Sequence, residues 1–403
     1  LSRELTDCVA NLELSRTATT NTPMLLKDLA GRPDALSYLE QSIIDGHPLH
    51  PLCRTRMGMS AADIRRYAPE FRTVVELPIV DVPPERWLST GAGLPPRLPM
   101  HPWQAERYDL PVSGRTIRAR PLMSLRTLEL ADEPGWHLKT SIDVQMTSAE
   151  RTVSPAAVHN GPAMSRLLRK VARGEPLEVM DEFAAGAMLV DGRPSRHFAV
   201  VRRRAPALGP GEIAVPLAVL SARSPATGRP FLSECADDVG AFVTDLLTLL
   251  LPPLLRLLGR GVALEAHGQN TLVILRDLRP VRLAYRDMGG VRVSPRRLAA
   301  AGIEAPRLLG DLITDDPAVL RTKLTAAVIS TVTAQLIDTA GDPGLWRTVA
   351  GILRAIPGDA HQRADVATIL EGTLPMKAMT AMRLAAEPLE DIWTAVPSPM
   401  ADL

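Results

Sequence analysis

The chain has 403 residues, of which 46% are hydrophobic and 23% are charged, and its formal net charge is +1. This length is enough for two or three domains with substantial cores, and the near-neutral charge excludes partners recognised by bulk electrostatics, such as nucleic acid or an acidic membrane surface. Three scattered cysteines provide neither a disulfide framework nor a zinc motif, which favours a reducing, cytoplasmic location.

The N-terminal part of the chain has a helical pattern. Leu36, Leu39 and Ile43 recur at the spacing that places apolar side chains on one face of a helix. Pro33 suits the first turn of this helix, and Gly46 ends it.

The middle of the chain has the pattern of strands. Residues 69–136 combine many prolines with short apolar runs, which predicts short strands and loops. One strand is predicted over residues 137–146, with Lys139 on its polar face. A helix is expected in residues 158–182, and a second β segment from 197 to about 221.

The C-terminal part is predicted to be mostly helical. The most apolar stretch, residues 241–258, contains the pair Pro252-Pro253, so we expect two buried helical pieces and no membrane span. Repeated Leu, Ile and Ala spacing predicts further helices from residue 299 to the end.

The most informative motif is Glu265-Ala-His-Gly-Gln-Asn270, followed by Arg286-Asp287 after a strand–turn–strand pattern. A hairpin brings its two ends together, so Glu265 and Asp287 are expected to be neighbours. Two carboxylates in one cleft repel each other unless a cation lies between them. The motif therefore indicates a magnesium-nucleotide enzyme.

A second motif places two histidines, His47 and His50, each before a proline, with Arg54, Arg56 and Gly58 shortly after. The prolines favour a stiff, non-helical loop. An anion-binding corner and a pair of surface turn histidines explain this pattern equally well.

Hydroxyl donors occur next to cationic side chains at several places in the middle of the chain. Taken singly, each is most simply a surface pair, but together they predict convergence on one polyanion, because arginine and lysine both bind phosphate and carboxylate oxygens. His159-Asn160 follows them and is expected to lie on a loop entering a helix, where its polar groups serve as caps or as ligands. The donor residues are Ser124, Arg126, Lys139, Thr147, Ser148 and Arg151.

The chain contains no Walker loop, no dinucleotide-binding glycine motif and no Gly-x-Ser-x-Gly elbow. A nucleotide is therefore expected to be held by side chains and not by a glycine-rich loop.

Taken together and in this order, the motifs resemble those of the NRPS-independent siderophore synthetases of the IucA/IucC family. The resemblance covers nearly the whole chain. It rests on His47-Pro-Leu-His-Pro, His101-Pro-Trp-Gln, Ser124-Leu-Arg-Thr, Lys139-Thr-Ser, Thr147-Ser-x-x-Arg151, His159-Asn-Gly, Glu265-Ala-His-Gly-Gln-Asn, Arg286-Asp287 and Leu374-Pro-Met-Lys377.

The resemblance implies an α+β fold shaped like a cupped hand. Residues 1–60 would form a helical thumb, residues 61–230 the β-rich fingers with the ATP and acid motifs, and residues 231–403 the mostly helical palm. The chain is shorter than typical members before His47, so part of the thumb is expected to be absent. Dimers are common in this family, so a homodimer is expected, while the composition predicts a cytoplasmic protein without nucleic-acid or membrane partners.

The resemblance also implies an activity and a set of site residues. Members use ATP and magnesium to adenylate a carboxylic acid such as citrate, and then join it to an amine or an alcohol. Arg151, His267 and Lys139 match catalytic positions, and Glu265 and Asp287 match magnesium-binding carboxylates. The ATP-binding set is Ser124, Arg126, Lys139, Ser148, Arg151, His267, Gln269 and Asn270, and the substrate-binding set is His47, His50, Arg54, Thr147, Arg151 and His159.

Two features depart from the family. Arg54 stands where lysine is common, which changes hydrogen-bond geometry. The family's C-terminal region is related to ferric-siderophore reductases that hold iron–sulfur clusters, but this chain lacks clustered cysteines, so that chemistry is not expected.

Two other functions fit parts of the pattern. An ATP-dependent phosphotransferase also places an Asn before a magnesium-binding Asp, and it would release ADP in place of AMP and pyrophosphate. A non-catalytic protein that binds the acid or a siderophore would show binding without turnover. The proton acceptor for the incoming amine is expected to be His267, His47 or His50.

Overall fold

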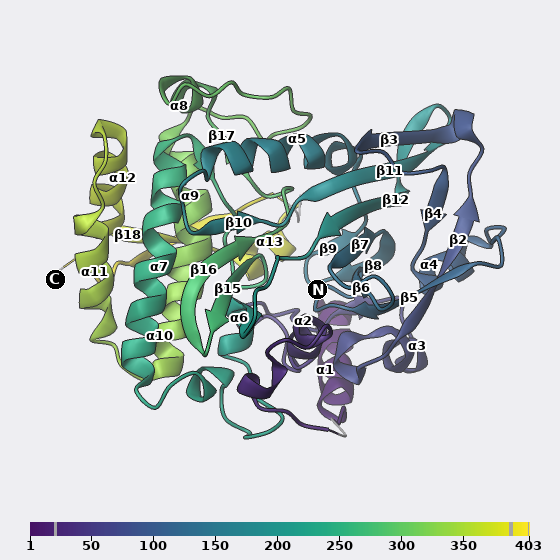
Figure 1. Cartoon of the computed structure of the whole chain (residues 1–403), viewed down its shortest axis with the longest axis horizontal. Helices are drawn as coiled ribbons and strands as arrows, with labels where there is room; N and C mark the ends of the chain where they lie inside the picture. Colours follow the sequence, from purple (N-terminus) through teal and green to yellow (C-terminus); the bar gives the residue numbers. More distant parts are fainter. Residues whose placement is uncertain (20–21, 387–389, 402) are drawn as a thin grey trace.

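The computed structural model describes residues 1–19, 22–386, 390–401 and 403. A bundle of helices lies at one end of the molecule and a large antiparallel sheet at the other, with a smaller sheet between them (Figure 1). The α+β class predicted from the sequence is confirmed.

The large sheet has eight strands, all in antiparallel pairs. It confirms the predicted β-rich middle. Helix α5 (Pro155–Val171) lies beside this sheet and packs against its strands β3, β11 and β12 (Figure 1). In spatial order the strands are β3 (Trp87–Gly91), β11 (Glu182–Val190), β12 (Arg193–Arg204), β7 (Trp136–Thr140), β6 (Thr127–Leu130), β5 (Thr116–Pro121), β2 (Val75–Asp81) and β4 (Arg97–Pro99).

The single strand predicted over residues 137–146 is wrong. The chain leaves the large sheet after β7 and turns at Ser141, whose hydroxyl donates to the carbonyl of Arg196 at 2.7 Å. It then enters β8 (Ile142–Met146), which forms a separate three-stranded sheet with β1 (Arg56–Met57) and β9 (Ala149–Arg151). Alternating polarity continues through the turn, so the sequence pattern does not reveal it.

The small central sheet contains the predicted hairpin. Strands β15 (Thr271–Arg276) and β16 (Arg279–Tyr285) pair antiparallel, and β10 (Leu177–Val179) and β13 (Glu212–Pro216) flank them. Asp277 and Leu278 both have positive φ, as a tight hairpin turn of the right twist requires. Because β10 and β13 precede residue 231, this sheet joins the chain segments expected to form the fingers and the palm.

The longest helix, α7 (Val239–Gly259), passes through Pro252 and Pro253 without a break, which corrects the prediction of two pieces. Leucines on both sides of the prolines are fully buried, and this packing outweighs the local cost of proline. By length and composition alone α7 could cross a membrane, but 61% of its most apolar window is buried inside the protein. It is a core helix.

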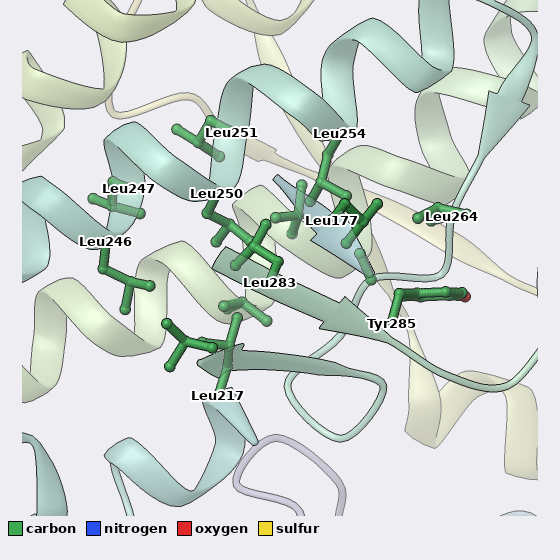
Figure 2. Packing of buried hydrophobic residues seen from close by; sticks show 14 of the residues in the cluster. Leu177, Leu217, Leu246, Leu247, Leu250, Leu251, Leu254, Leu264, Leu283 and Tyr285 are labelled. Carbon is green, nitrogen blue, oxygen red and sulfur yellow. The ribbon is translucent and has the colours of Figure 1, made fainter. Parts of the chain in front are cut away.

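The core lies between α7 and the central sheet. Figure 2 shows Leu250 and Leu254 of α7 pointing toward Leu177 of β10 and Leu283 of β16. The remaining helices of the bundle are α8 (Pro295–Ala300), α9 (Pro317–Ala327), a π-helical turn (Val328–Thr333), α10 (Ala334–Ala340), α11 (Leu345–Ala355) and α12 (Ala360–Leu370).

The C-terminal part is not entirely helical, which corrects a second expectation. After α12, β18 (Thr373–Lys377) pairs antiparallel with β19 (Trp393–Pro397), and α13 (Met379–Leu384) lies between them in sequence. The other helices are α1 (Ser2–Arg16), α2 (Ala35–Glu40), α3 (Ala61–Tyr67), α4 (Pro102–Tyr108) and α6 (Leu217–Leu220). The short strands β14 (Val262–Ala263) and β17 (Arg292–Val293) form a separate antiparallel pair.

We predict that Leu250→Ala lowers the free energy of unfolding by about 2–5 kcal/mol, because it leaves a cavity between α7 and the central sheet. Urea denaturation measures this change. Thr248→Ala, on the exposed side of the same helix, is the control and should change stability by less than about 0.5 kcal/mol. Similar midpoints for both variants would contradict the placement of the core.

Candidate active site

An ion pair between the large sheet and the end of the hairpin forms the centre of the site. Lys139 Nζ in β7 lies 2.6 Å from Asp287 Oδ2, which follows β16. Burial opposes the charge of Asp287, but Lys139, Arg126 and Arg203 outweigh it and hold the pKa of this carboxyl below its usual value. Asp287 is therefore ionised at neutral pH.

Two more cations, both half-buried, lie close to this pair. Arg126 precedes β6 and donates to the carbonyl of Thr152, and Arg151 at the end of β9 donates to the hydroxyl of Thr147. Burial lowers the pKa of Arg126 to about 10, which leaves it charged at neutral pH. The result is a local excess of positive charge, suited to a polyanion.

The Glu265–Asn270 segment forms a tight turn between β14 and β15. The amide N–H groups of Asn270 and Thr271 donate to the carbonyl of His267 at 2.9 and 3.0 Å. The amide N–H of Arg286 in turn donates to the carbonyl of Asn270 at 2.9 Å, and the guanidinium of Arg286 donates to the carbonyl of Gln269 at 2.9 Å. The two ends of the hairpin are thus held together, as the sequence predicted.

Glu265 packs against the loop that follows Asp287. A Cβ atom added to Gly290 would lie only 1.9 Å from the Oε2 atom of Glu265, so a larger residue at this position would displace the Glu265 carboxylate. Glu265 has cationic partners of its own, since Lys323 Nζ lies 2.7 Å and Lys377 Nζ 4.0 Å from its Oε1 atom. Each of the two predicted magnesium carboxylates is therefore paired with lysine.

These two carboxylates match what magnesium requires from a protein that also binds a nucleotide. Magnesium is usually held by one or two carboxylates together with substrate phosphates and water, and not by an all-protein cage. Within residues 1–19, 22–386, 390–401 and 403, no group of three or more His, Cys, Asp or Glu side chains has the arrangement of a metal site. Glu265 and Asp287 thus remain the predicted magnesium ligands, with phosphate oxygens completing the shell.

Three histidines face the same space. Burial, His267 and Arg151 lower the pKa of His47 to about 4, and burial, His47 and Arg151 do the same for His50. His50 Nε2 lies 2.8 Å from the hydroxyl oxygen of Ser148. Burial also lowers the pKa of His267. All three rings are therefore neutral at pH 7.

The backbone fixes the tautomer of these neutral rings. The Nδ1 atoms of His47 and His50 accept the amide N–H of Leu49 and Leu52 at 3.2 and 3.0 Å, and that of His267 accepts the amide N–H of Gln269 at 3.3 Å. A neutral imidazole that accepts at Nδ1 carries its proton on Nε2. The three rings thus present N–H donors to the site, which does not favour the expected role of a histidine as the base.

Comparison with known proteins identifies the family. The model of the IucA / IucC family matches residues 35–93 and 96–222, and that of the ferric iron reductase FhuF-like transporter matches residues 241–388. The chain belongs to the IucA/IucC family. Its members are ATP-dependent acid–amine ligases of siderophore synthesis.

Curated relatives of this family member include two enzymes of Staphylococcus aureus (strain NCTC 8325 / PS 47). Staphyloferrin A synthase is 26% identical over 88% of this chain and 71% of the relative. D-ornithine–citrate ligase is 26% identical over 65% of this chain. The chain spans about half the length of several other curated relatives that it matches.

Solved structures share the fold. The petrobactin biosynthesis protein AsbB of Bacillus anthracis str. Sterne has a TM-score of 0.82 at 20% identity, over 99% of this chain and 78% of that protein. The ATP-bound aerobactin synthetase IucA of Klebsiella pneumoniae has a TM-score of 0.80 at 19% identity, over 99% of this chain and 82% of that protein.

The FhuF-like region of this IucA/IucC member contains no cysteine. Cys8, Cys53 and Cys235 all precede it and are free thiols. Because iron–sulfur clusters in proteins are held chiefly by several cysteine thiolates, residues 241–388 do not supply such a ligand set.

Two predicted substrate residues lie outside the cluster. Each guanidinium nitrogen of Arg54 faces an internal acceptor, namely the carbonyls of Ile43 and Ile44 or the carboxylate of Glu70 at 3.6 Å. We therefore reassign Arg54 from substrate binding to support of the His47–His50 loop. His159 is exposed inside helix α5, not on an entry loop, and its ring makes no hydrogen bond or ion pair within the part of the chain that the structure describes.

The sequence analysis missed Glu40, which joins two parts of the site. Its Oε1 atom accepts from the guanidinium of Arg286 at 2.6 Å, and its Oε2 atom accepts the amide N–H of Met123 at 3.0 Å. Glu40 is 1% exposed. It therefore orients both the loop of Ser124 and the segment of Asp287. Glu40 stands four residues after Leu36, on the apolar face of the predicted helix, and this position is the sequence feature that indicates a buried carboxylate.

We predict that Glu70→Gln lowers the free energy of unfolding by about 3 kcal/mol at pH 7, because it leaves Arg54 and Arg56 buried without their carboxylate. Burial alone would raise the pKa of Glu70, but Arg54 and Arg56 lower it to about 2 from the ordinary value of 4.5. Its contribution is therefore complete above pH 4.5 and fades as the pH falls through 2.

Urea denaturation of both proteins at pH 7 and pH 3 measures this difference, which should be smaller at pH 3. The exposed change Glu13→Gln on α1 serves as the control. An equal effect of both variants at pH 7 would contradict the role of Glu70.

Proposed function

We propose that this chain adenylates a small polycarboxylic acid and condenses it with an amine or an alcohol in siderophore synthesis. The observation that carries the proposal is the ion pair of Lys139 with Asp287, set among Arg126 and Arg151 and next to Glu265. The relative named D-ornithine–citrate ligase joins citrate to an amine, as its name states, which supports a citrate-like acid.

In the first step, a carboxylate oxygen of the acid attacks the α-phosphate of ATP. The bond from that phosphorus to the bridging oxygen breaks, and pyrophosphate leaves with the electron pair. Both reactants are anionic, so Lys139, Arg126 and Arg151 lower the barrier by neutralising their approach. Magnesium, bound to Glu265, Asp287 and phosphate oxygens, would add two positive charges at the departing pyrophosphate.

In the second step, the nitrogen of the acceptor attacks the acyl carbon. A C–N bond forms, the C–O bond to the phosphate breaks, and AMP leaves. An acceptor that arrives as an ammonium ion releases two protons to water, one before attack and one as the tetrahedral adduct collapses. The Nε2–H groups of His47 and His267 donate to oxygens of the acid or the phosphate, while that of His50 orients the hydroxyl of Ser148.

The polar residues near these groups complete the proposed subsites. Ser124, Gln269 and Asn270 would contact the phosphates. Thr147 and Ser148, at the turn between β8 and β9, would contact the acid together with Arg151. A cytoplasmic location and a homodimer remain predictions, and size-exclusion chromatography with light scattering tests the latter.

We predict that Arg151→Ala lowers acid-dependent pyrophosphate release by at least about 100-fold near neutral pH, because the site loses a half-buried cation that would face both anions. Pyrophosphate release with ATP, magnesium and the acid measures this loss. Arg166→Ala, an exposed arginine on α5, is the matched control. Near-normal release by a folded Arg151→Ala protein would refute the role.

The acid itself can be found by trapping. A panel of small carboxylic acids is incubated with ATP, magnesium and hydroxylamine, and a coloured hydroxamate marks the acid that is activated. Formation of AMP supports adenylation, whereas ADP would show a phosphotransferase. Binding of an acid with no product from any nucleophile would show a non-catalytic protein.

A further inference from the structure

A cavity of about 230 Å³ borders the loop that follows Asp287, and its lining includes none of His47, His50 and His267. It opens between the first turns of α5, the start of β11, the loop after β16 and the segment 309–312. Met288 and Gly289 line it directly after Asp287, so a molecule in the cavity is adjacent to the site of adenylation. The other lining residues are Ser154, Ala156, Ala157, Asn160, Gly161, Glu182, Arg292, Leu309, Gly310, Asp311 and Leu312.

Glu182 lies in the wall of this cavity and has no role in the mechanism above. It is the first residue of β11 and is 3% exposed. Among the described residues, the only hydrogen bond to its carboxylate is a long one, in which the amide N–H of Met288 lies 3.5 Å from Oε1. No cation of the described residues lies within the 4 Å of an ion pair, in contrast to Asp287 and Glu265.

Burial raises the pKa of the Glu182 carboxyl, although Lys139 and Arg203 act in the opposite direction. A cationic ligand against this side chain would favour its ionised form and offset the cost of burying the charge. The structure brings helix α5 very close to this carboxylate, since a Cβ atom on Gly161 would lie 2.2 Å from Glu182 Oε2. Asn160, the preceding residue of α5, exchanges two hydrogen bonds with the backbone of Leu309 at 2.8 and 2.9 Å. Helix α5 is therefore tied to the segment 309–312, which also lines the cavity.

The remaining walls favour an aliphatic cation. Ala156, Ala157, Leu309 and Leu312 offer apolar surface to methylene groups, and Asp311 adds a second carboxylate. Arg292 is the only basic residue among those that line the cavity.

We propose that this cavity binds the acceptor substrate, an aliphatic amine whose ammonium group lies against Glu182. The inference rests on the proposed function, because it assigns the second substrate of the same reaction. The amine would wait beside Asp287 while the acyl-adenylate forms, and would then reach the acyl carbon across the phosphate cluster.

The test separates the two half-reactions. Glu182→Gln removes the charge and keeps the shape, so KM for the amine should rise roughly 10- to 100-fold, the range expected for losing a hydrogen bond to a charged group. Hydroxylamine is small and mostly neutral at pH 7, so hydroxamate formation should stay within about threefold of wild type. Ornithine, spermidine and 1,5-diaminopentane are the probes, and the one that the wild-type chain condenses fastest is used.

Two further variants protect the test from folding artefacts. Ala156→Leu fills the cavity without a change of charge and should also impair condensation with the amine while sparing hydroxamate formation. Glu150→Gln removes an exposed carboxylate beside Arg151 but outside the cavity, and should leave both reactions unchanged.

Three outcomes would overturn the proposal. If Glu182→Gln raises KM for ATP in pyrophosphate exchange and leaves KM for the amine unchanged, the cavity holds the nucleoside. Unchanged condensation in both cavity variants, or a wild-type chain that forms hydroxamates but condenses none of the amines, would also exclude the acceptor site. Failure of hydroxamate formation in wild type with every acid would instead disprove the proposed function.

Discussion

The active site depends on two consecutive residues at the end of one hairpin strand, each paired with a different part of the molecule. Arg286 pairs with Glu40 of helix α2 at 2.6 Å, and Asp287 pairs with Lys139 of the large sheet at 2.6 Å. The backbone N–H of Arg286 also donates to the carbonyl of Asn270. Together these contacts set the relative positions of helix α2, the large sheet and the Glu265–Asn270 turn. The central sheet is thus the element on which the other parts are aligned.

Such pairs are poor candidates for general stabilisation, because the cost of burying charge cancels most of the attraction. Their effect is geometric, because Asp287 and Glu40 hold the side chains of Lys139 and Arg286 in place before any ligand binds. Arg126 and Arg151 have no carboxylate within 4 Å among the described residues, and they lie beside pairs whose charges already cancel. The site therefore keeps a net positive charge for a polyanion, while the packing of α7 supplies the stability that holds it together.

The sequence predicted what depends on local pattern or on an ordered set of motifs. The hairpin after Asn270 and the approach of Glu265 to the loop of Asp287 followed from period-two alternation around a turn. Features decided by tertiary contacts could not be predicted. The turn at Ser141 keeps the alternation of a strand, and the partners of Arg54 and Glu40 come from segments that no local pattern connects.

The histidine tautomers have a consequence for the chemistry as a whole. Carboxylate and phosphate groups present only acceptor oxygens. The protein side chains that hold a carboxylate next to a phosphate must therefore be hydrogen-bond donors. Nδ1 of His47, His50 and His267 is occupied by backbone N–H groups, and the low pKa of each ring keeps it neutral. These rings therefore add N–H donors without adding charge to a region already rich in cations. A protonated histidine at this place would repel Arg151. Burial and Arg151 both lower the pKa of His47 and His50, so these rings stay neutral and keep one N–H donor each.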